Sequence, residues 1–476
     1  MSAPIAEPMM HADLAQLAAH MPGARMTANA AFDGVSTDSR QLAPGQLFVA
    51  LRGETYDAHS FLPTLAGQDG KPLAAAVVAE QLPSGWTLPA LIVPNTLTAL
   101  GQIGHYWREQ FSIPVIGVTG SNGKTTVKEM IAAILAAAHG EDGRLATRGN
   151  LNNEIGVPLT LMRLAPQHRA AVIEMGMNHP GEIARLAAIA APTVAMVNNA
   201  QREHQEFMHT VEAVARENGA VLAALPASGA AVYPADDVYT PLWASLAGAR
   251  RSVTFGLTDA ADVSCTYTAG SFGSELAVTA RIDGGEAKTF GISLAAAGLH
   301  NVRNALAAIA CALAAGVPQD AIVDGLNSFA PVSGRLQRKL GANGVTVIDD
   351  SYNANPDSVR AAIDVLAQAA GTRILVLGDM GEVGTQGRQF HEEIAAYAAG
   401  AGIEHVLVTG ELARHMRGNG DASVVKHFEQ FDELLAALDT ALGSKSDATV
   451  LVKGSRFMKM ERVVRHLTGT HNKEAH

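Results

Sequence analysis

The sequence predicts an α/β protein built from three domains. Two long stretches of the chain alternate apolar runs with helical segments, which is the pattern of a parallel sheet with crossover helices. A shorter segment rich in turns precedes them. A chain of 476 residues is also too long for one hydrophobic core, and common domain sizes divide it into about three domains. The changes of pattern put the boundaries at residues 111/112 and 338/339.

The first domain, residues 1–111, is expected to be small and of mixed α/β type. Short apolar runs such as 47–51 and 91–93 alternate there with clusters of Gly, Pro and Asp, as in a domain of short strands and turns. A helix is expected over 97–111. Because Pro114 cannot continue a helix, we expect a strand of the next domain to begin beside it.

The central domain, residues 112–338, is predicted to hold a doubly wound sheet. The expected strands are 115–118, 170–174 and 194–197, and the helices after them are 127–138, 181–191 and 210–225. From 251 to 294 the pattern changes to strand-like alternation, which predicts an antiparallel extension of the same sheet. A helix over 301–315 is expected to close the domain.

The third domain, residues 339–476, repeats the alternation on a smaller scale. Its expected strands lie at 345–348, 374–377, 405–408 and 449–452. Helical segments separate these strands, so the sequence predicts a C-terminal Rossmann-like α/β domain.

The composition excludes several classes of protein. Hydrophobic residues make up 48% of the chain and charged residues 17%, as in a folded globular protein. A formal net charge of −11 argues against a broad surface for nucleic acid or anionic membranes, because such surfaces favour basic residues. The first basic residue is Arg25, so no secretory signal is expected, and the most apolar runs are shorter than a bilayer crossing. We expect a cytoplasmic protein with no nucleic-acid partner and no membrane insertion.

The strongest motif is a glycine loop between the strand at 115–118 and the helix that follows it. The loop reads Gly120, Ser121, Asn122, Gly123, Lys124, Thr125 and Thr126. Backbone N–H groups of such a loop attract phosphate oxygens, a lysine adds positive charge, and a threonine hydroxyl can bind Mg²⁺. A strict P-loop would need glycine where Val118 stands, so the pattern is GxxGKTT. The sequence predicts a P-loop-type ATPase domain with this variant loop.

Other polar residues follow strand ends, where α/β domains bind their ligands. Glu174 ends the strand at 170–174 and is a candidate metal ligand. His204 follows the strand at 194–197 and would bind metal or substrate, although a lone histidine in a loop is more often plain surface. In the third domain, Asp350 ends the first strand and would meet ribose or metal.

Taken together, these motifs resemble the Mur ligase family over nearly the whole chain. The resemblance rests on the glycine loop, on Glu174 and on further runs at 36–40, 57–59, 149–156, 300–305, 349–356, 378–382 and 452–455. Within the family, the run Ser-Tyr-Asn-Ala-Asn-Pro at 351–356 is similar to that of members that add D-alanyl-D-alanine. The Asp-Asn-Pro-Arg signature of the diaminopimelate-adding relatives is absent.

The resemblance implies a reaction and a division of tasks among the domains. It implies an ATP-dependent amide-forming ligase that joins D-alanyl-D-alanine to UDP-N-acetylmuramoyl-tripeptide through an acyl phosphate, with ATP and Mg²⁺, as a monomer. The first domain would hold the UDP-sugar substrate and the central domain ATP. The third would bind the incoming dipeptide and close over the site.

The resemblance also implies roles for particular residues. The catalytic residues would be Lys124, Glu174 and His204, and the metal ligands would be Thr125, Glu174 and His204. ATP would be bound by the glycine loop from Gly120 to Thr126 and by Asn301, Asn304, Arg335 and Asp350. The substrates would be bound by Ser36, Thr37, Asp38, Ser39, Arg40, Asp57, His59, Asn153, Asn353 and Asn355.

One position departs from the family pattern. Members commonly carry a lysine, often carbamylated to bridge a metal site, where this chain has Asn218. The chain has no lysine between Lys128 and Lys288 that could take its place. We expect Asn218 or Glu217 to hold this site instead.

Two other interpretations stay open. A ligase of the same fold with another substrate, such as a folylpolyglutamate synthase or the diaminopimelate-adding ligase, would share the glycine loop. The Thr-Asp-Ser-Arg and Asp-Ala-His runs of the first domain favour a nucleotide-sugar substrate instead. A nucleotide-binding switch that uses ATP without ligation would leave Glu174, His204 and the third-domain motifs unexplained.

Overall fold

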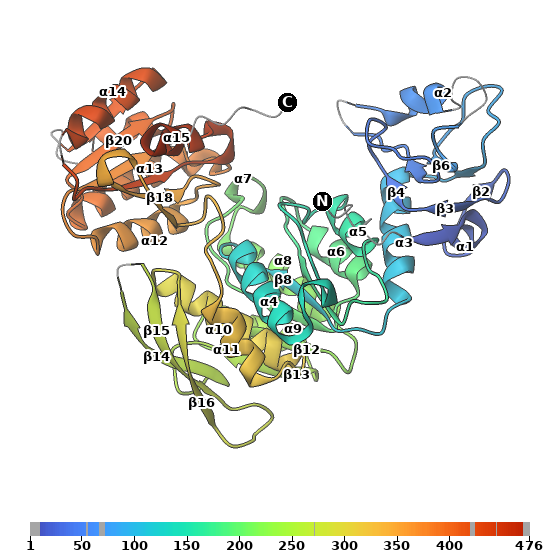
Figure 1. The fold of residues 1–476 in the computed structure, drawn as a ribbon, viewed down its shortest axis with the longest axis horizontal. Coiled ribbons are helices and arrows are strands. Elements are labelled where there is room, and N and C mark those ends of the chain that lie inside the picture. Colours follow the sequence, from blue (N-terminus) through green and yellow to red (C-terminus); the bar gives the residue numbers. More distant parts are fainter. Residues whose placement is uncertain are drawn as a thin grey trace, which may run out of the picture.

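The computed structural model of the protein describes residues 10–53, 56–65, 72–270, 272–418, 424–443 and 445–469. Its strands form a two-stranded ribbon and three larger sheets of five, nine and six strands. Figure 1 shows these sheets in three bodies, with the first (blue) and the third (orange to red) on opposite sides of the central one. Each body has its own buried apolar core. The predicted three-part α/β architecture is therefore confirmed.

The first body is built on the five-stranded sheet, in the order β2-β7-β6-β5-β4. Its strands are β2 Arg25–Met26, β4 Val35–Ser36, β5 Leu47–Val49, β6 Ala76–Ala79 and β7 Ala90–Ile92. Strands β4 to β7 run parallel, and β2 pairs antiparallel at one edge. The other elements are β1 His11–Asp13, β3 Ala31–Asp33, α1 Leu14–Ala18, the 3-10 helix η1 Ala58–Phe61 and α2 Leu62–Leu65. The side chains of β5 and β6 are wholly buried and form the centre of this small mixed body.

Helix α3 (Thr96–Glu109) joins the first body to the central one. It approaches the central body closely, since a Cβ atom on Gly104 would lie 2.8 Å from Pro158 Cα. Trp107 donates a hydrogen bond from Nε1 to the Leu164 carbonyl at 3.0 Å. Apolar side chains of both bodies pack along this helix. The first body is thus attached through an apolar seam.

The central body contains the nine-stranded sheet, in the order β16-β15-β14-β13-β12-β11-β8-β10-β9. The strands are β8 Val115–Thr119, β9 Arg144–Ala146, β10 Ala170–Glu174, β11 Val194–Val197, β12 Ala230–Pro234, β13 Arg251–Phe255, β14 Val263–Ala269, β15 Ser274–Ala280 and β16 Lys288–Leu294. The helices are α4 Lys124–His139, α5 Gly156–Leu161, α6 Glu182–Ala190, α7 Gln205–Met208, α8 Val211–Ala223, α9 Thr240–Ala247, α10 Leu299–Ala314 and α11 Gln319–Asn327. The antiparallel extension begins at β14 and not at residue 251 as predicted, because β13 pairs in parallel with β12 and β14. The alternation of apolar and polar side chains along one strand does not show whether the neighbouring strand runs parallel or antiparallel to it.

The side chains of β8 alternate between two cores. Ile116 and Val118 join the core that includes α4 and α10, whereas Val115 joins the core that includes α6 and α8. Helices therefore cover both faces of the sheet, which confirms the doubly wound arrangement. The carboxyl ends of β8, β10 and β11 meet at one edge, with Val118 opposite Glu174 and Met196.

The third body contains the six-stranded sheet, in the order β17-β18-β22-β19-β20-β21. Its strands are β17 Gln337–Leu340, β18 Thr346–Asp350, β19 Arg373–Leu377, β20 His405–Thr409, β21 Val425–Phe428 and β22 Thr449–Lys453. Its helices are α12 Pro356–Ala367, α13 Gly387–Gly400, α14 Phe431–Leu442 and α15 Glu461–Thr468. A boundary at 338/339 would cut β17, which is polar and gave no apolar signal, so this body is better begun at Gln337. None of the helices in the described part of the chain has the length and apolar content that a bilayer crossing requires.

Candidate active site

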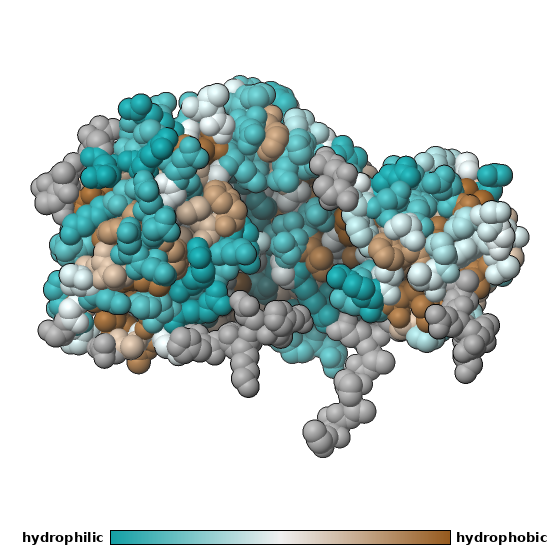
Figure 2. Space-filling model, turned by 90° about the horizontal axis from the view of Figure 1, so that it is seen from above, coloured by the Kyte–Doolittle hydropathy of each residue, from teal (hydrophilic) through white to brown (hydrophobic). Residues whose placement is uncertain are grey.

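A cavity of about 890 Å³ lies where the central and third bodies face each other. It opens at the carboxyl edge of β8, β10 and β11, the edge at which α/β sheets bind ligands. Figure 2 shows the molecule hollowed between its two outer bodies, with a mostly hydrophilic surface in the hollow. The lining side chains come from the glycine loop, from the ends of these strands, from the start of α10 and from the third body.

The glycine loop connects β8 to α4 and lines the cavity from Ser121 onwards. Gly120 and Gly123 have positive φ angles of 132° and 82°. A Cβ atom on Gly123 would lie 2.4 Å from Asn304 Oδ1, so only glycine fits this approach. Helix α4 begins at Lys124 without a side-chain cap. Its first N–H groups are therefore available to an anionic ligand, as the motif predicted.

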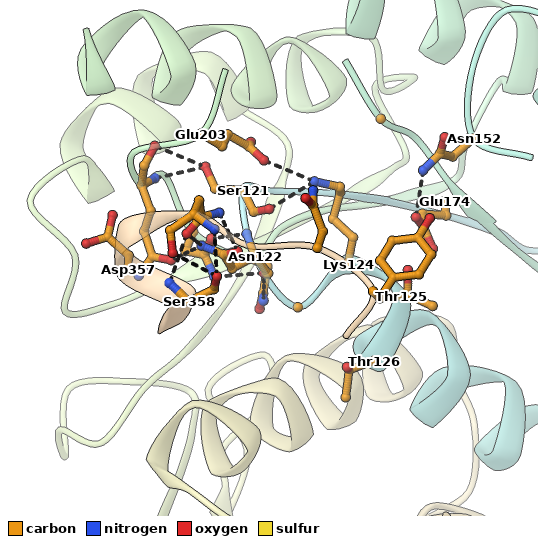
Figure 3. A pocket seen from close by; sticks show the side chains of 18 of the residues that line it. Ser121, Asn122, Lys124, Thr125, Thr126, Asn152, Glu174, Glu203, Asp357 and Ser358 are labelled. Carbon is orange, nitrogen blue, oxygen red and sulfur yellow. Dashed lines mark hydrogen bonds and ion pairs between the residues drawn. The ribbon is translucent and has the colours of Figure 1, made fainter. Parts of the chain in front are cut away.

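Lys124 is held against the loop. Its Nζ atom donates hydrogen bonds to the carbonyls of Gly120 and Ser121 at 2.5 and 3.0 Å. It also lies 3.4 Å from Glu203 Oε2, as Figure 3 shows. Glu203 is 7% exposed, and its Oε1 atom has no hydrogen-bond partner among the described residues. No sequence motif includes Glu203, although it directly precedes His204.

Glu174 ends β10 and points into the same cavity. It is 2% exposed, and Oε1 accepts a hydrogen bond from Asn152 Nδ2 at 2.8 Å (Figure 3). The other carboxylate oxygen, Oε2, is buried without a partner in the described part of the chain. Thr125 is also buried and lines the same cavity. A buried carboxylate oxygen and a hydroxyl in one cavity are oxygen ligands of the kind that Mg²⁺ takes.

His204 lies at the start of α7 and lines the cavity, but its ring contacts the third body. Nδ1 lies 2.7 Å from Glu382 Oε2, and Nε2 lies 3.9 Å from Glu203 Oε2. The close approach of the His204 ring, with a smaller effect of the Lys124 charge, lowers the pKa of Glu382. Among the described residues, no group of three His, Cys, Asp or Glu side chains is arranged to hold a metal ion. The prediction that Thr125, Glu174 and His204 are metal ligands stays a prediction.

The start of α10 supplies two buried amides. Asn301 and Asn304 line the cavity and are 5% and 4% exposed. Asn304 donates to Asn301 Oδ1 at 3.1 Å and accepts from Asn198 Nδ2 at 2.8 Å. This chain of amides ties α10 to the end of β11 and to the glycine loop. Burial, with a smaller effect of the Lys453 charge, lowers the pKa of the neighbouring His300 to about 4.

Arg335 and Asp350 lie on the side of the cavity formed by the third body. The Arg335 guanidinium stacks on the Tyr352 ring, 4.2 Å from its centre. Asp350 Oδ2 lies 2.6 Å from Lys453 Nζ, and Oδ1 accepts the Leu336 N–H group at 3.1 Å. Burial raises the pKa of Asp350, and the Lys453 charge opposes this. Both predicted residues are thus brought to the cavity.

Three predicted substrate-binding asparagines also line the cavity. Asn153 Oδ1 accepts two backbone N–H groups at the start of α5, and Asn353 Oδ1 accepts the next N–H group along the chain at 2.9 Å. Asn355 caps α12 and donates from Nδ2 to Asn122 Oδ1 at 2.9 Å. Figure 3 shows the start of α12, at Asp357, beside Asn122. The third body therefore touches the glycine loop directly.

The predicted residues of the first body do not line this cavity. They are Ser36, Thr37, Asp38, Ser39, Arg40, Asp57 and His59. Ser36 ends β4, and the others follow β4 or the neighbouring parallel strand β5, so they lie towards the carboxyl ends of these strands. Asp57 accepts the His59 N–H group at 3.0 Å, and this bond leads the contacts that lower the pKa of Asp57 to about 2. The Arg40 guanidinium likewise lowers the pKa of Asp38 to about 2. They form a second polar cluster, away from the glycine loop.

Asn218 and Glu217 do not line the cavity either. Asn218 is 1% exposed, and its Oδ1 atom accepts the Gly120 N–H group at 2.9 Å. Glu217 accepts the N–H groups of Gly181 and Ile183 at 2.8 and 2.9 Å, at the start of α6. The Asn218 amide oxygen and the Glu217 carboxylate thus both accept backbone N–H groups. The expectation that one of them holds the second metal site stays a prediction.

Sequence comparison finds two families of domains in this chain. The Mur ligase middle domain matches residues 118–312, and the Mur ligase, glutamate ligase domain matches residues 334–456. The chain is 38% identical to the UDP-N-acetylmuramoyl-tripeptide–D-alanyl-D-alanine ligase of Escherichia coli, over 96% of this chain and 99% of that protein. It is 34% identical to the ligase of the same name from Bacillus subtilis, over 91% and 93% of the two chains.

Solved structures agree with these matches. MurF from Acinetobacter baumannii superposes with a TM-score of 0.88 at 32% identity, over 97% of this chain and 100% of the other. MurF ligase from Thermotoga maritima in complex with ADP gives 0.79 at 26% identity, over 91% and 96%. A folylpolyglutamate synthase from Mycobacterium tuberculosis, at 0.61 and 19% identity over 79% and 95%, shares the fold.

Proposed function

We propose a function from one premise, which these matches establish: the chain belongs to the Mur ligase family. It is an ATP-dependent amide-forming ligase that joins D-alanyl-D-alanine to UDP-N-acetylmuramoyl-tripeptide, a step in the synthesis of the peptidoglycan precursor. One observation carries the assignment within the molecule. The GxxGKTT loop faces a cavity whose opposite wall is formed by the Ser-Tyr-Asn-Ala-Asn-Pro run of the third body.

In the first step that we propose, a carboxylate oxygen of the tripeptide attacks the γ-phosphorus of ATP and ADP leaves. Negative charge on the transferred group is met by the Lys124 ammonium and by the N–H groups of the first turn of α4. Lys124 now donates to the carbonyls of Gly120 and Ser121. Nucleotide binding would exchange these carbonyls for phosphate oxygens with little movement of the side chain.

We also propose that Mg²⁺ binds beside the phosphates. It would offset charge on the phosphoryl oxygens and fix their geometry. The unpartnered Oε2 atom of Glu174 and the hydroxyl of Thr125 fit this task, since both are buried at the cavity. His204 would join them only after leaving Glu382, to which it is now paired.

In the second step, the free amine of D-alanyl-D-alanine attacks the acyl carbon. Phosphate leaves with the electrons of the carbon–oxygen bond, and the amine gives up a proton. Water would hydrolyse the acyl phosphate, so the site has to be covered while it exists. The third body supplies this cover, and Asn353 and Asn355 on it are our candidates for binding the dipeptide.

The remaining contacts are proposed by position. Asn301 and Asn304 would contact adenine, Arg335 the phosphates and Asp350 the ribose, because all four line the nucleotide cavity. The polar cluster of the first body, within residues 1–111, would bind the uridine diphosphate end of the substrate. All of these groups belong to one chain, so we propose a monomer, and we place the reaction in the cytoplasm, where ATP is supplied.

A coupled assay of ADP release tests the assignment. Purified protein with ATP, Mg²⁺ and UDP-N-acetylmuramoyl-tripeptide should release ADP steadily only after D-alanyl-D-alanine is added. Parallel reactions contain diaminopimelate in place of the dipeptide, or a folate with glutamate in place of both substrates. Release that depends on either replacement, or release that needs no acceptor at all, would contradict the proposed reaction.

A further inference from the structure

We propose that Arg202 is a positioning residue, which docks the third body so that α12 meets the glycine loop. Arg202 belongs to the central body, in the loop between β11 and α7. Its partners belong to two helices of the third body. The sequence motifs do not include it, and no step of the reaction above uses it.

The contacts of Arg202 use every part of its guanidinium group. Nη2 and Nε donate to Asp357 Oδ1 at 2.7 and 3.1 Å, and Nη1 donates to Glu393 Oε2 at 2.9 Å. The guanidinium carbon lies 5.2 Å from the centre of the Phe390 ring. The Arg202 backbone N–H group also donates to Asp357 Oδ2 at 2.9 Å. This fork geometry fixes orientation as well as distance, which a single ion pair does not.

The burial of these groups makes the link stronger than an ordinary surface ion pair. The side chains of Arg202 and Asp357 are each 22% exposed, and that of Glu393 is 31% exposed. Exposed ion pairs contribute little to stability, and removing one member of a fully buried pair is strongly destabilising. The contribution of a partly buried pair such as this one is intermediate. Removing Arg202 would leave two partly buried carboxylates of the third body, Asp357 and Glu393, without their partner from the central body.

The backbone beside Arg202 is strained on both sides of the joint. His204 and Glu382 both have positive φ angles, of 48° and 57°, and they are paired with each other across the joint. Glu206 N–H donates to the Glu382 carbonyl at 3.4 Å. Left-handed backbone at non-glycine residues persists only where surrounding contacts impose it. The Arg202 network lies next to this pair and is suited to impose it.

The docking places one end of α12 at the reaction site. Asp357 is the second residue of α12, and the cap of that helix, Asn355, is hydrogen-bonded to Asn122 of the glycine loop. Gln201, which precedes Arg202, accepts from Asn122 Nδ2 and contacts Ser121. Arg202 therefore couples the position of the dipeptide-binding body to the loop that holds the phosphates.

The test compares Arg202→Ala with the matched control Arg360→Ala in the full-length protein. Arg360 also donates to Glu393, at 2.8 Å, but it lies within the third body and does not line the cavity. We expect Arg202→Ala to lower kcat/KM for D-alanyl-D-alanine by about tenfold or more, and Arg202→Lys to recover part of that loss. Arg360→Ala should stay within about threefold of wild type, as removal of an exposed pair predicts.

Two further readouts separate positioning from general damage. Small-angle X-ray scattering should show a larger radius of gyration for Arg202→Ala alone, since the third body is released. The double variant Arg202→Ala with Asp357→Ala should lose no more kcat/KM than Arg202→Ala does, because both changes break the same link. Unchanged scattering, unchanged kinetics, or losses that add in the double variant would each overturn the inference. The kinetic arm rests on the proposed ligase function, whose failure would appear separately as a wild-type protein without dipeptide-dependent turnover.

Discussion

Replacing Lys453 by methionine should destabilise the third body strongly, because it removes the partner of a buried carboxylate. Lys453 Nζ lies 2.6 Å from Asp350 Oδ2, and the two side chains are 4% and 12% exposed. The pair joins the carboxyl ends of β18 and β22, where the two residues stand opposite each other. Without Lys453, the Asp350 side chain would keep only one hydrogen bond among the described residues, that from the Leu336 N–H group.

The expected loss is about 3 to 5 kcal/mol, the range for a buried ion pair that loses one member. Lys339→Met is the matched control. Lys339 Nζ also lies 2.6 Å from a neighbouring carboxylate, that of Asp349, but its side chain is 32% exposed. Asp349 is itself only 4% exposed, but its Oδ1 atom keeps hydrogen bonds from the Ser351 hydroxyl and N–H group at 2.6 and 3.2 Å. The control should therefore lose only about 1 kcal/mol.

Hydrogen exchange of the β22 amides is the suitable assay. The three tryptophans, at positions 86, 107 and 243, all lie outside the third body, so their fluorescence does not report on it. Exchange in Lys453→Met should be about a hundredfold faster or more, and in Lys339→Met less than about tenfold faster. The difference should shrink as the pH falls, because protonation removes the uncompensated charge of Asp350. Equal exchange in the two variants would refute the reasoning.

Three further predictions concern the cavity. Lys124→Ala should lower turnover by about a hundredfold to a thousandfold with an unchanged circular-dichroism spectrum, and turnover near that of wild type would reject the role of the loop. Gly123→Ala should weaken ADP binding in calorimetric titration, since the new Cβ atom would lie 2.4 Å from Asn304 Oδ1; equal affinity would contradict this. The pKa of His300, lowered to about 4 by burial, means that its neutral form contributes stability above pH 6.5, which is lost as the pH falls towards 4. Urea denaturation at a series of pH values measures this change in the free energy of unfolding. His300→Gln should reduce the change between pH 6.5 and pH 4 by up to about 3 kcal/mol, and identical pH dependence in the variant and wild type would show that His300 titrates normally.

The fold was predictable where the chain has a strong apolar period. The strand expected at 170–174 is β10 to the residue, and the helix expected at 97–111 is α3 with ends shifted by one and two residues. The polar edge strand β17 was missed, because an exposed edge needs no apolar side chains. Strand β12 was missed as well, because a short apolar run that begins with two alanines is equally compatible with a helix.

The candidate site was predictable where a motif fixes the spacing of its residues. The glycine loop, Glu174 and the two amides of α10 were found in this way, and they line the cavity, the loop from Ser121 onwards. No motif could identify Arg202 and Glu203, because their roles depend on how the third body docks. His204 shows the same limit: its position was predicted, but its pairing with Glu382, 178 residues along the chain, was not.

The two outer bodies are joined to the centre by forces of different kinds. The first is attached along α3 by apolar packing, and the third largely by charged and amide side chains around Arg202. Dissolved salt screens the attraction between partly exposed charges. This attraction extends over about 8 Å at physiological ionic strength and over about 3 Å at 1 M salt. Salt does not weaken apolar contacts. Ionic strength should therefore loosen one joint and spare the other. We therefore expect the cavity between the central and third bodies to widen as the salt concentration rises, while the first body keeps its place on α3.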